Sequence, residues 1–433
     1  MKEKLLERFL RYVAVTSQSN AKAGVVPSTE GQRRLAELLA EELRELGLEK
    51  IEISEKSVLT AHLPSNLPEG RKAAVVGWVA HLDTVDVALS PDIHPQVIRN
   101  YQGGDICLNA EKDIWLRTSE HPEVNDYIGD DLVVTDGTSV LGADNKSAIA
   151  NIMTSLETVI RENRPHGDLY VAFVPDEEIG LLGAKAMDFT KFPVDYAYTI
   201  DCCAVGEVVY ETFNAGGATL SIRGVTAHPM SSKGVLVNPA LIATDFINML
   251  DRGSTPECTE GTEGFVWVNG IQATPAAATV SVKIRDHNKA GYEAKKRLIA
   301  SAVEYLKVRH PKAKIELKMS DVYGNIADAI SDENRGCIDL LYRALEETGV
   351  QAKTIAMRGG TDGSFISTKG IPTPNYFTGG LNFHSHCEFL PLGAMEKSTK
   401  VTLKLIDLIA AAGSARCAGG KRLRPPAFDS FRV

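Results

Sequence analysis

Acidic and histidine side chains follow two apolar, strand-like runs of this chain. The run at 73–80 leads into His81 and Asp83, and the run at 169–174 leads into the adjacent residues Glu177 and Glu178. Successive side chains of an extended backbone point to opposite sides. One glutamate could therefore hold a metal ion while the other handles a proton, and the residue types alone allow either assignment.

Three further candidate ligands occupy loop-like positions: Asp144 at the entrance to a helical pattern, Asp201 after an apolar run, and His384 beyond a Gly-Gly pair. Imidazole and carboxylate groups suit divalent first-row metals, especially zinc. Two ions could share such a set if one carboxylate bridges them, and paired metals about 3.5–4 Å apart are an established device for hydrolysis. The combined set favours a two-metal hydrolytic site built from His81, Asp144, Glu178, Asp201 and His384.

Each of these residues also has an ordinary structural interpretation. Asp144 could cap a helix, which contributes about 1 kcal/mol, and Asp201 could simply end a strand. Paired glutamates are common in solvated turns, and His384 and His386 could be surface histidines. These alternatives are reasonable one by one. They explain less well why all the candidates fall at strand ends or in glycine-rich loops.

Composition limits the class of protein. A chain of 433 residues exceeds what one core usually holds, so two domains are expected. A net charge of −9 argues against nucleic acid as the main partner. Apolar stretches stay short of the ~20 residues needed to cross a bilayer, so a membrane is not an expected partner. Seven cysteines without a repeating spacing argue against a disulfide framework and favour a cytoplasmic location.

The order of predicted elements indicates an α/β catalytic domain with a mixed, mostly parallel sheet and helices on both faces. Ligands of such sheets bind beyond the carboxyl ends of the strands, where the candidate residues fall. The apolar spacing predicts helices at 1–16, 29–48, 146–162, 334–348 and 392–411, and strands at 73–80, 132–135, 169–174, 196–200 and 354–357.

The pattern changes between residues 214 and 327. Alternating segments at 217–223, 264–270, 277–284 and 313–319 accompany helical patterns at 237–251 and 290–308. We expect a smaller α+β domain, 214–327, inserted into a main domain made of 1–213 and 328–413. Residues 414–433 are basic and contain Gly-Gly and Pro-Pro pairs, which predicts a mobile tail.

Several short motifs occur together in this chain. They are Gln102-Gly103-Gly104-Asp105-Ile106, Thr135-Asp136-Gly137, Thr255-Pro256-Glu257 with Thr259-Glu260-Gly261, Ile284-Arg285-Asp286 and Arg358-Gly359-Gly360-Thr361-Asp362-Gly363. With the His-x-Asp, Asp-x-Lys and Glu-Glu motifs of the candidate site, the chain resembles the M20 family of metallopeptidases and, within it, the peptidase T branch of tripeptide aminopeptidases. The resemblance runs from the N-terminal helix to about residue 411.

The resemblance implies a role for each candidate residue. It implies two zinc ions per subunit, held by His81, Asp144, Glu178, Asp201 and His384, with Asp144 as the bridge. Glu177 would be the general base, and Asp83 would accept the second ring N–H of His81 and so orient it. The family's spacing of a histidine four residues before a glutamate selects His384, with Glu388, over His386. Asn145 stands where relatives often carry a second aspartate that is not a ligand.

Three residues outside this cluster receive roles only from the resemblance. On its own, His228 reads as a turn histidine, and Arg285 and Arg358 read as ordinary ion-pair residues. The resemblance implies that the inserted domain forms a homodimer and that His228 reaches the partner's active site to stabilise an oxyanion. It also makes Arg285 and Arg358 candidates for binding a peptide carboxylate, which a guanidinium can pair in bidentate fashion.

The predicted function is therefore that of a cytoplasmic, homodimeric, di-zinc aminopeptidase that removes the N-terminal residue from short peptides, above all tripeptides. Two alternatives stay open. One is another M20-type zinc hydrolase, namely a dipeptidase, a carboxypeptidase or an N-acyl-amino-acid hydrolase. The other is a non-catalytic peptide-binding protein on the same fold.

Overall fold

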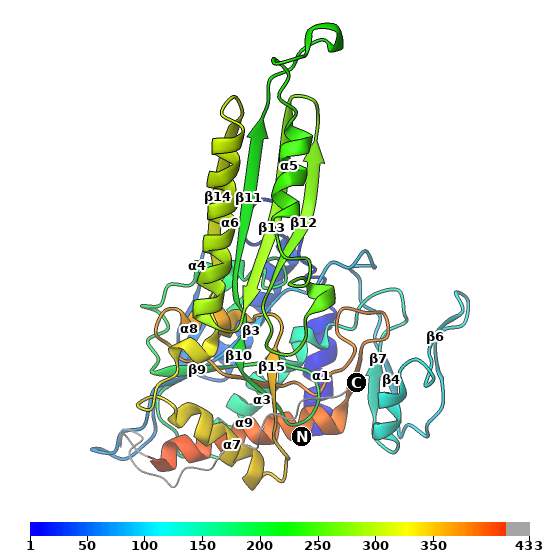
Figure 1. Ribbon diagram of the computed structural model, residues 1–433. Coiled ribbons are helices and arrows are strands. Elements are labelled where there is room, and N and C mark those ends of the chain that lie inside the picture. The colour runs from blue at the N-terminus through cyan, green and yellow to red at the C-terminus, as the bar shows by residue number, and fades with distance from the viewer. Residues whose placement is uncertain (413–433) are drawn as a thin grey trace. The chain divides into compact units, whose positions relative to one another are not determined.

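The computed structural model describes residues 1–412, which form two compact units whose elements are labelled in Figure 1. The first unit comprises Met1–Tyr210, Ala329–Ile355 and the described residues from Thr361 onward. The second comprises Glu211–Asp328 and Ala356–Gly360. The tail predicted at 414–433 lies outside the described residues. None of the helices within residues 1–412 combines the length and apolarity that crossing a bilayer requires.

An eight-stranded sheet runs through the first unit, and the predicted α/β fold class is confirmed. The strands β8, β3, β9 and β16 are parallel neighbours, whereas β1 with β2, β2 with β8, and β10 with β16 pair antiparallel, so the parallel part is smaller than expected. In spatial order the strands are β1 (Glu49–Ile53), β2 (Leu59–Leu63), β8 (Leu169–Val174), β3 (Val76–His81), β9 (Tyr196–Cys202), β16 (Asn375–Phe377), β10 (Glu207–Thr212) and β15 (Lys353–Met357).

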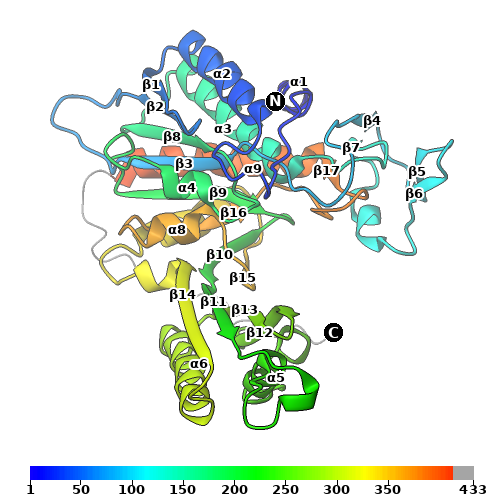
Figure 2. The ribbon, with the colours of Figure 1, turned by 90° about the horizontal axis from the view of Figure 1, so that it is seen from above.

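Helices cover both faces of this sheet. The helices α3 (Ala143–Arg161) and α8 (Asp362–Ser367) both pack against β3 and β9, and Figure 2 shows them on opposite sides. This explains why β3 and β8 are buried at every position and read as continuous apolar runs. The remaining helices are α1 (Lys2–Val13) and α9 (Leu392–Ala412) on α3, α7 (Gly336–Glu347) on α9, α4 (Leu182–Ala186) on α8, and α2 (Glu30–Glu45) on β1 and β2.

The strand predicted at 132–135 is present as β7 (Leu132–Val134), but it belongs to a separate small sheet. There it pairs with β4 (Gln96–Ile98) and β17 (Phe389–Pro391). A local apolar core that includes Leu116, Val124 and Phe389 accounts for this placement. The hairpin of β5 (Ile106–Asn109) and β6 (Ile114–Leu116) and the short helix η1 (Pro122–Tyr127) complete this part of the unit.

The second unit is an antiparallel sheet with two helices along one face (Figure 1). Inward residues alternate with exposed ones along β11, as expected for a sheet covered on one side. Its own core includes Leu220, Phe246, Val280 and Val303. The strands, in spatial order, are β12 (Phe265–Ala273), β13 (Ala277–Asp286), β11 (Asn214–Arg223) and β14 (Lys314–Tyr323), and the helices are α5 (Pro239–Asn248) and α6 (Lys289–Arg309).

Candidate metal centre

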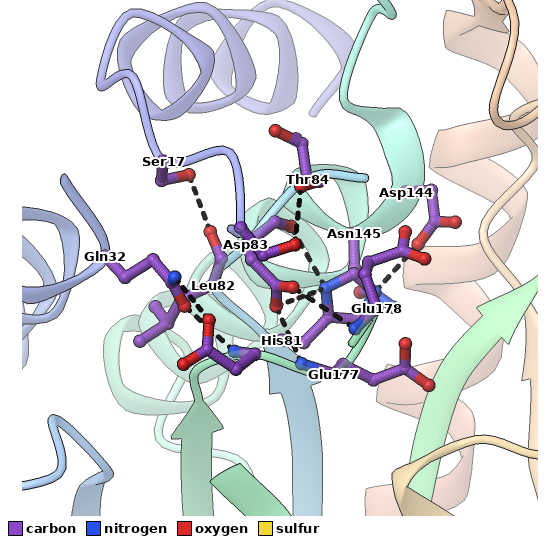
Figure 3. Close-up of polar contacts among 12 residues, drawn as sticks. Ser17, Gln32, His81, Leu82, Asp83, Thr84, Asp144, Asn145, Glu177 and Glu178 are labelled. Atoms are coloured by element: carbon purple, nitrogen blue, oxygen red, sulfur yellow. Dashed lines mark hydrogen bonds and ion pairs between the residues drawn. The ribbon is translucent and has the colours of Figure 1, made fainter. Parts of the chain in front are cut away.

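The five predicted ligands all lie in the first unit, and three of them come from neighbouring parallel strands. His81 ends β3, Asp201 lies near the end of β9, and Glu178 follows β8, whose last residue Val174 is in register with His81. Carboxyl ends of parallel strands meet at one edge of a sheet, which is why these side chains converge. Figure 3 shows Glu177 and Glu178 leaving their turn in different directions.

Asp144 stands at the centre of the group. Its Oδ1 lies 2.8 Å from Nε2 of His81, and its Oδ2 lies 3.0 Å from Nε2 of His384. The backbone of Asp144 and Asn145 is not helical, so regular helix begins only after them and the carboxylate is free to face both rings. One carboxylate between two imidazoles is the arrangement that a bridging ligand requires.

Of the two remaining carboxylates, one lies near His384 and the other near His81. Oε1 of Glu178 lies 3.0 Å from Nε2 of His384, and Oδ1 of Asp201 lies 3.8 Å from Nε2 of His81. Asn145 holds Asp201 by donating from Nδ2 to Oδ1 at 2.6 Å. Among the described residues, His81, Asp144 and Glu178 form a group whose ligand atoms all lie within 4.8 Å of one another, close enough to share one metal ion. Asp144 thus has donors of the kind that a cation needs on both of its sides.

Asp83 contacts both His81 and the turn that carries Glu177 and Glu178. Its Oδ1 lies 3.3 Å from Nδ1 of His81, although the better-formed contact of that nitrogen is with the backbone oxygen of Asp83 at 3.0 Å. The same carboxylate accepts the backbone N–H groups of Glu177 at 3.0 Å and Glu178 at 3.2 Å. It is completely buried. Asp83 therefore ties the turn carrying both glutamates to the end of β3, a contact that sequence reasoning did not foresee.

A buried lysine lies behind the ligands. Lys146 is fully buried, and its Nζ donates to Oγ of Ser17 at 2.7 Å, which donates in turn to the oxygen of Leu82 at 2.7 Å. Burial lowers the pKa of Lys146 to about 8, against the pull of the surrounding carboxylates. The chain of bonds links the start of α3 to the loop after His81.

The acidic groups of the site are crowded and largely removed from water. Burial raises the pKa of Glu177 and of Asp201 well above the ordinary range, and nearby acidic groups raise both further. Hydrogen bonds to Asp144 and Glu178 raise the pKa of His384 to about 10. For Asp144 burial opposes ionisation, but hydrogen bonds from His384 and His81 lower its pKa below the ordinary value.

Two further observations show that the residues fit divalent cations. Oε1 of Glu178 is buried and lies 3.0 Å from Nε2 of His384, but it lacks a hydrogen bond of good geometry. Asp362, which sequence reasoning left unassigned, is also buried with Oδ1 unpartnered, and burial raises its pKa to about 7. Uncompensated buried carboxylates are costly unless paired or bound to metal. The oxygen and imidazole donors are those that zinc and similar ions accept.

The three other predicted residues belong to the second unit. His228 is exposed, and its Nδ1 accepts the backbone N–H of Met230 at 3.2 Å. Nη1 of Arg285 donates to the oxygens of Gly216 at 3.0 Å and Ile284 at 2.9 Å. His228 is therefore accessible, whereas the half-buried guanidinium of Arg285 lies over the ring of Tyr323, 5.7 Å from its centre, and among the described residues makes its hydrogen bonds through Nη1.

Arg358 is more heavily engaged than Arg285. Its guanidinium carbon lies 5.3 Å from the ring centre of Phe213 and 5.5 Å from that of Phe265. Its nitrogens donate to Oγ1 of Thr259 and to the backbone oxygens of Gly261 and Glu263. These contacts hold the 259–263 loop and leave few donors for a ligand.

Residues 142–408 match the peptidase family M20/M25/M40, and this span includes Asp144, Glu177, Glu178, Asp201 and His384. The chain belongs to this family. The chain is 51% identical to a peptidase T-like protein of Rhizobium meliloti, over 95% of this chain and 99% of the relative. It is 42% identical to peptidase T of Caldanaerobacter subterraneus, over 94% of this chain and 98% of the relative. The resemblance to M20 peptidases of the peptidase T branch is confirmed.

Solved structures agree on the fold of this M20 peptidase. The aminopeptidase PepT of Bacillus cereus matches with a TM-score of 0.73 at 21% identity, covering 95% of this chain and 99% of that chain. A dinuclear metal-binding M20 peptidase of Bacillus subtilis matches with a TM-score of 0.63 at 14% identity, covering 95% and 98%. At these identities the likeness concerns the fold alone.

Proposed function

We propose that this M20 peptidase is a di-zinc aminopeptidase that removes the N-terminal residue from tripeptides. The observation that carries the metal part is Asp144, whose two oxygens each face a histidine nitrogen, at 2.8 and 3.0 Å. The substrate part is supported by relatives named peptidase T and by solved structures called an aminopeptidase and a tripeptidase. One ion would be held by His81, Asp144 and Asp201, and the other by His384, Asp144 and Glu178.

In this proposal the metals, when bound, would lower the pKa of water and polarise the peptide carbonyl. Glu177 takes the proton from the attacking water and delivers it to the leaving amine nitrogen as the C–N bond breaks. Burial raises the pKa of Glu177 well above the ordinary range, which makes its carboxylate a stronger proton acceptor. Asp83 keeps Glu177 and Glu178 in place through their backbone N–H groups.

We further propose that the protein is a cytoplasmic homodimer and that the inserted unit supplies substrate-binding residues. The exposure of His228 supports an oxyanion-stabilising role in a partner subunit. The hydrogen bonds of Arg285 among the described residues use Nη1, which supports it as the binder of the peptide carboxylate, and the engaged guanidinium of Arg358 favours a supporting role in the 259–263 loop. Cell fractionation tests the location: recovery in a secreted fraction would contradict it.

A panel of peptides tests the substrate. The purified protein, loaded with Zn²⁺, is incubated with one tripeptide in four forms: unblocked, N-acetylated, C-amidated and shortened to a dipeptide. We expect cleavage of the first bond of the unblocked tripeptide, loss of activity with EDTA and recovery with Zn²⁺. The C-amidated form should be a poor substrate for the wild type. An Arg285→Met variant should no longer distinguish it from the free acid.

The same panel separates the alternatives. Turnover of the acetylated form alone would identify an N-acyl-amino-acid hydrolase, and turnover of the dipeptide alone a dipeptidase. Release of the last residue instead of the first would identify a carboxypeptidase. Substoichiometric metal after careful loading, with no hydrolysis of any form, would favour a non-catalytic peptide-binding protein.

A further inference from the structure

Glu388 is a buried carboxylate to which the proposed mechanism assigns no task. It is 2% exposed and accepts three backbone N–H groups from the loop that enters α3. Oε2 accepts those of Leu141 at 2.7 Å and Gly142 at 3.1 Å, and Oε1 accepts that of Asp144 at 3.2 Å. N–H groups at a helix entrance have no partner within the helix, so a carboxylate there satisfies them.

Glu388 also belongs to the loop that carries His384. This loop is closed by paired backbone bonds between Leu381 and Phe389, at 2.9 and 3.1 Å, and Glu388 lies at its base. The N–H of Glu388 itself is bonded to the oxygen of Ser385 at 3.3 Å. His384 has a φ of 61°, a conformation that costs free energy for a non-glycine residue and needs support from its surroundings. The side chain of Glu388 thus joins the base of one ligand-bearing loop to the backbone of another.

We propose that Glu388 is the positioning residue that sets the separation of Asp144 and His384 and thereby the metal affinity of the site. This rests on the metal-binding part of the proposed function. The 3.0 Å contact between Oδ2 of Asp144 and Nε2 of His384 depends on how the two loops sit against each other. Groups behind the ligands commonly change metal affinity by about 10–100-fold when they are removed.

The number of acceptors makes the proposal specific. Three N–H groups converge on Glu388, and both of its oxygens are needed to accept them. Glutamine has the same shape but a single oxygen, so its NH₂ group must face at least one of these donors. In Glu388→Gln the NH₂ group therefore repels a backbone N–H group and pushes the two loops apart, while the glutamine side chain still fills the volume of the glutamate. Glu388→Asp keeps both oxygens but withdraws them by one methylene.

The test measures metal binding directly. Zn²⁺ is titrated into metal-free wild type and into both variants in competition with a chromophoric chelator, and Co²⁺ is used to record the ligand-field absorption of the site. We expect Glu388→Gln to bind Zn²⁺ about 10–100-fold more weakly than wild type, with an altered cobalt spectrum. Glu388→Asp should lie between the two. Circular dichroism of the metal-free proteins confirms that the variants are folded.

The matched control is Asp131→Asn. Asp131 likewise accepts a backbone N–H, from Asn100 at 2.8 Å, and holds no loop that carries a ligand. Its zinc affinity should equal that of wild type. A folded Glu388→Gln with wild-type affinity and cobalt spectrum, even if less heat-stable, would overturn the proposal. If that variant does not fold, unchanged affinity in Glu388→Asp overturns it. A wild type that binds no divalent metal would overturn the proposed function as well.

Discussion

At the scale of single residues, the site separates two neighbouring glutamates into different environments. Glu178 contacts His384 through its side chain at 3.0 Å, whereas Glu177 is held through its backbone, whose N–H donates to Asp83 at 3.0 Å and whose oxygen accepts from Leu181 at 2.8 Å. The proposed mechanism assigns proton transfer to the side chain of Glu177. This is the division of roles that the family resemblance implies, and it yields a direct test.

Replacing Glu177 with glutamine should leave metal binding intact and slow the reaction. We expect kcat for the unblocked tripeptide to fall about 10²–10⁴-fold, because glutamine cannot take up the proton of the attacking water. Zinc content and KM should stay close to wild type. Glu162→Gln, which removes an exposed glutamate, is the control and should be fully active. Near-normal kcat in Glu177→Gln would remove Glu177 as the base.

At the scale of elements, a network of ion pairs fixes the helix that introduces Asp144. Arg8 of α1 contacts Glu42 of α2 at 2.6 Å and Glu157 of α3 at 2.9 Å. Lys4 of α1 also contacts Glu157 at 2.6 Å, and the hydroxyl of Tyr12 donates to Glu42 at 2.7 Å. These contacts join α1, α2 and α3 near the C-terminal end of α3. The packing of the three helices therefore fixes where the first residues of α3, including Asp144, are placed.

The Glu157→Gln variant should be less stable than wild type by about 1–3 kcal/mol at pH 7, because it loses charge-assisted bonds. Burial opposes ionisation of Glu157, but Lys4 and Arg8 outweigh it and lower its pKa below the ordinary 4.5. The folded state thus binds this proton less readily than the unfolded state. The stabilisation is complete above about pH 4.5 and is lost as the pH falls through the lowered pKa.

Urea unfolding of wild type and Glu157→Gln across this pH range measures the difference between their free energies of unfolding. It should shrink toward zero under acidic conditions. Glu37→Gln is the control, since Glu37 is half exposed and, among residues 1–412, pairs with Arg33 on the same helix, which contributes little. A difference between Glu157→Gln and wild type that stays constant with pH would contradict the ion-pair explanation.

At the scale of the whole molecule, the chain divides its residues between two units. All five candidate ligands lie in the first unit, and His228 and Arg285 lie in the second, which has its own core. The proposal that the protein is a homodimer in which His228 acts in the partner subunit can be tested with mixed dimers. Sedimentation velocity should first show a particle of twice the 46.9 kDa chain.

Mixing two inactive variants tests the action between subunits. Glu177→Gln and His228→Ala should each be nearly inactive alone. After subunit exchange, one site of every mixed dimer has an intact Glu177 and receives an intact His228 from its partner. Random exchange should then restore about a quarter of wild-type activity. No recovery, although mixed dimers are demonstrated with affinity tags, would mean that His228 acts within its own subunit, and full activity of His228→Ala by itself would mean that it does not act at all.

Much of the architecture could be predicted because it follows from local periodicity. The helix expected at 290–308 is α6 (Lys289–Arg309), and the alternating segment at 277–284 lies within β13 (Ala277–Asp286). Short strands escaped prediction. β16 has three residues, Asn375–Phe377, which is too short to show alternation, and it forms only because β9 and β10 flank it.

Residue types and spacing are enough to predict the chemistry of the candidate site, because histidines and carboxylates at strand ends favour a hydrolytic metal site whatever their neighbours are. The groups that hold these candidate ligands in place become visible only in the folded chain. Asp83 binds the N–H groups of Glu177 and Glu178, and Glu388 binds that of Asp144. The physical reason is that these donors belong to the backbone, which is the same in every residue type except proline. No pattern of side chains reveals them until distant loops are brought together.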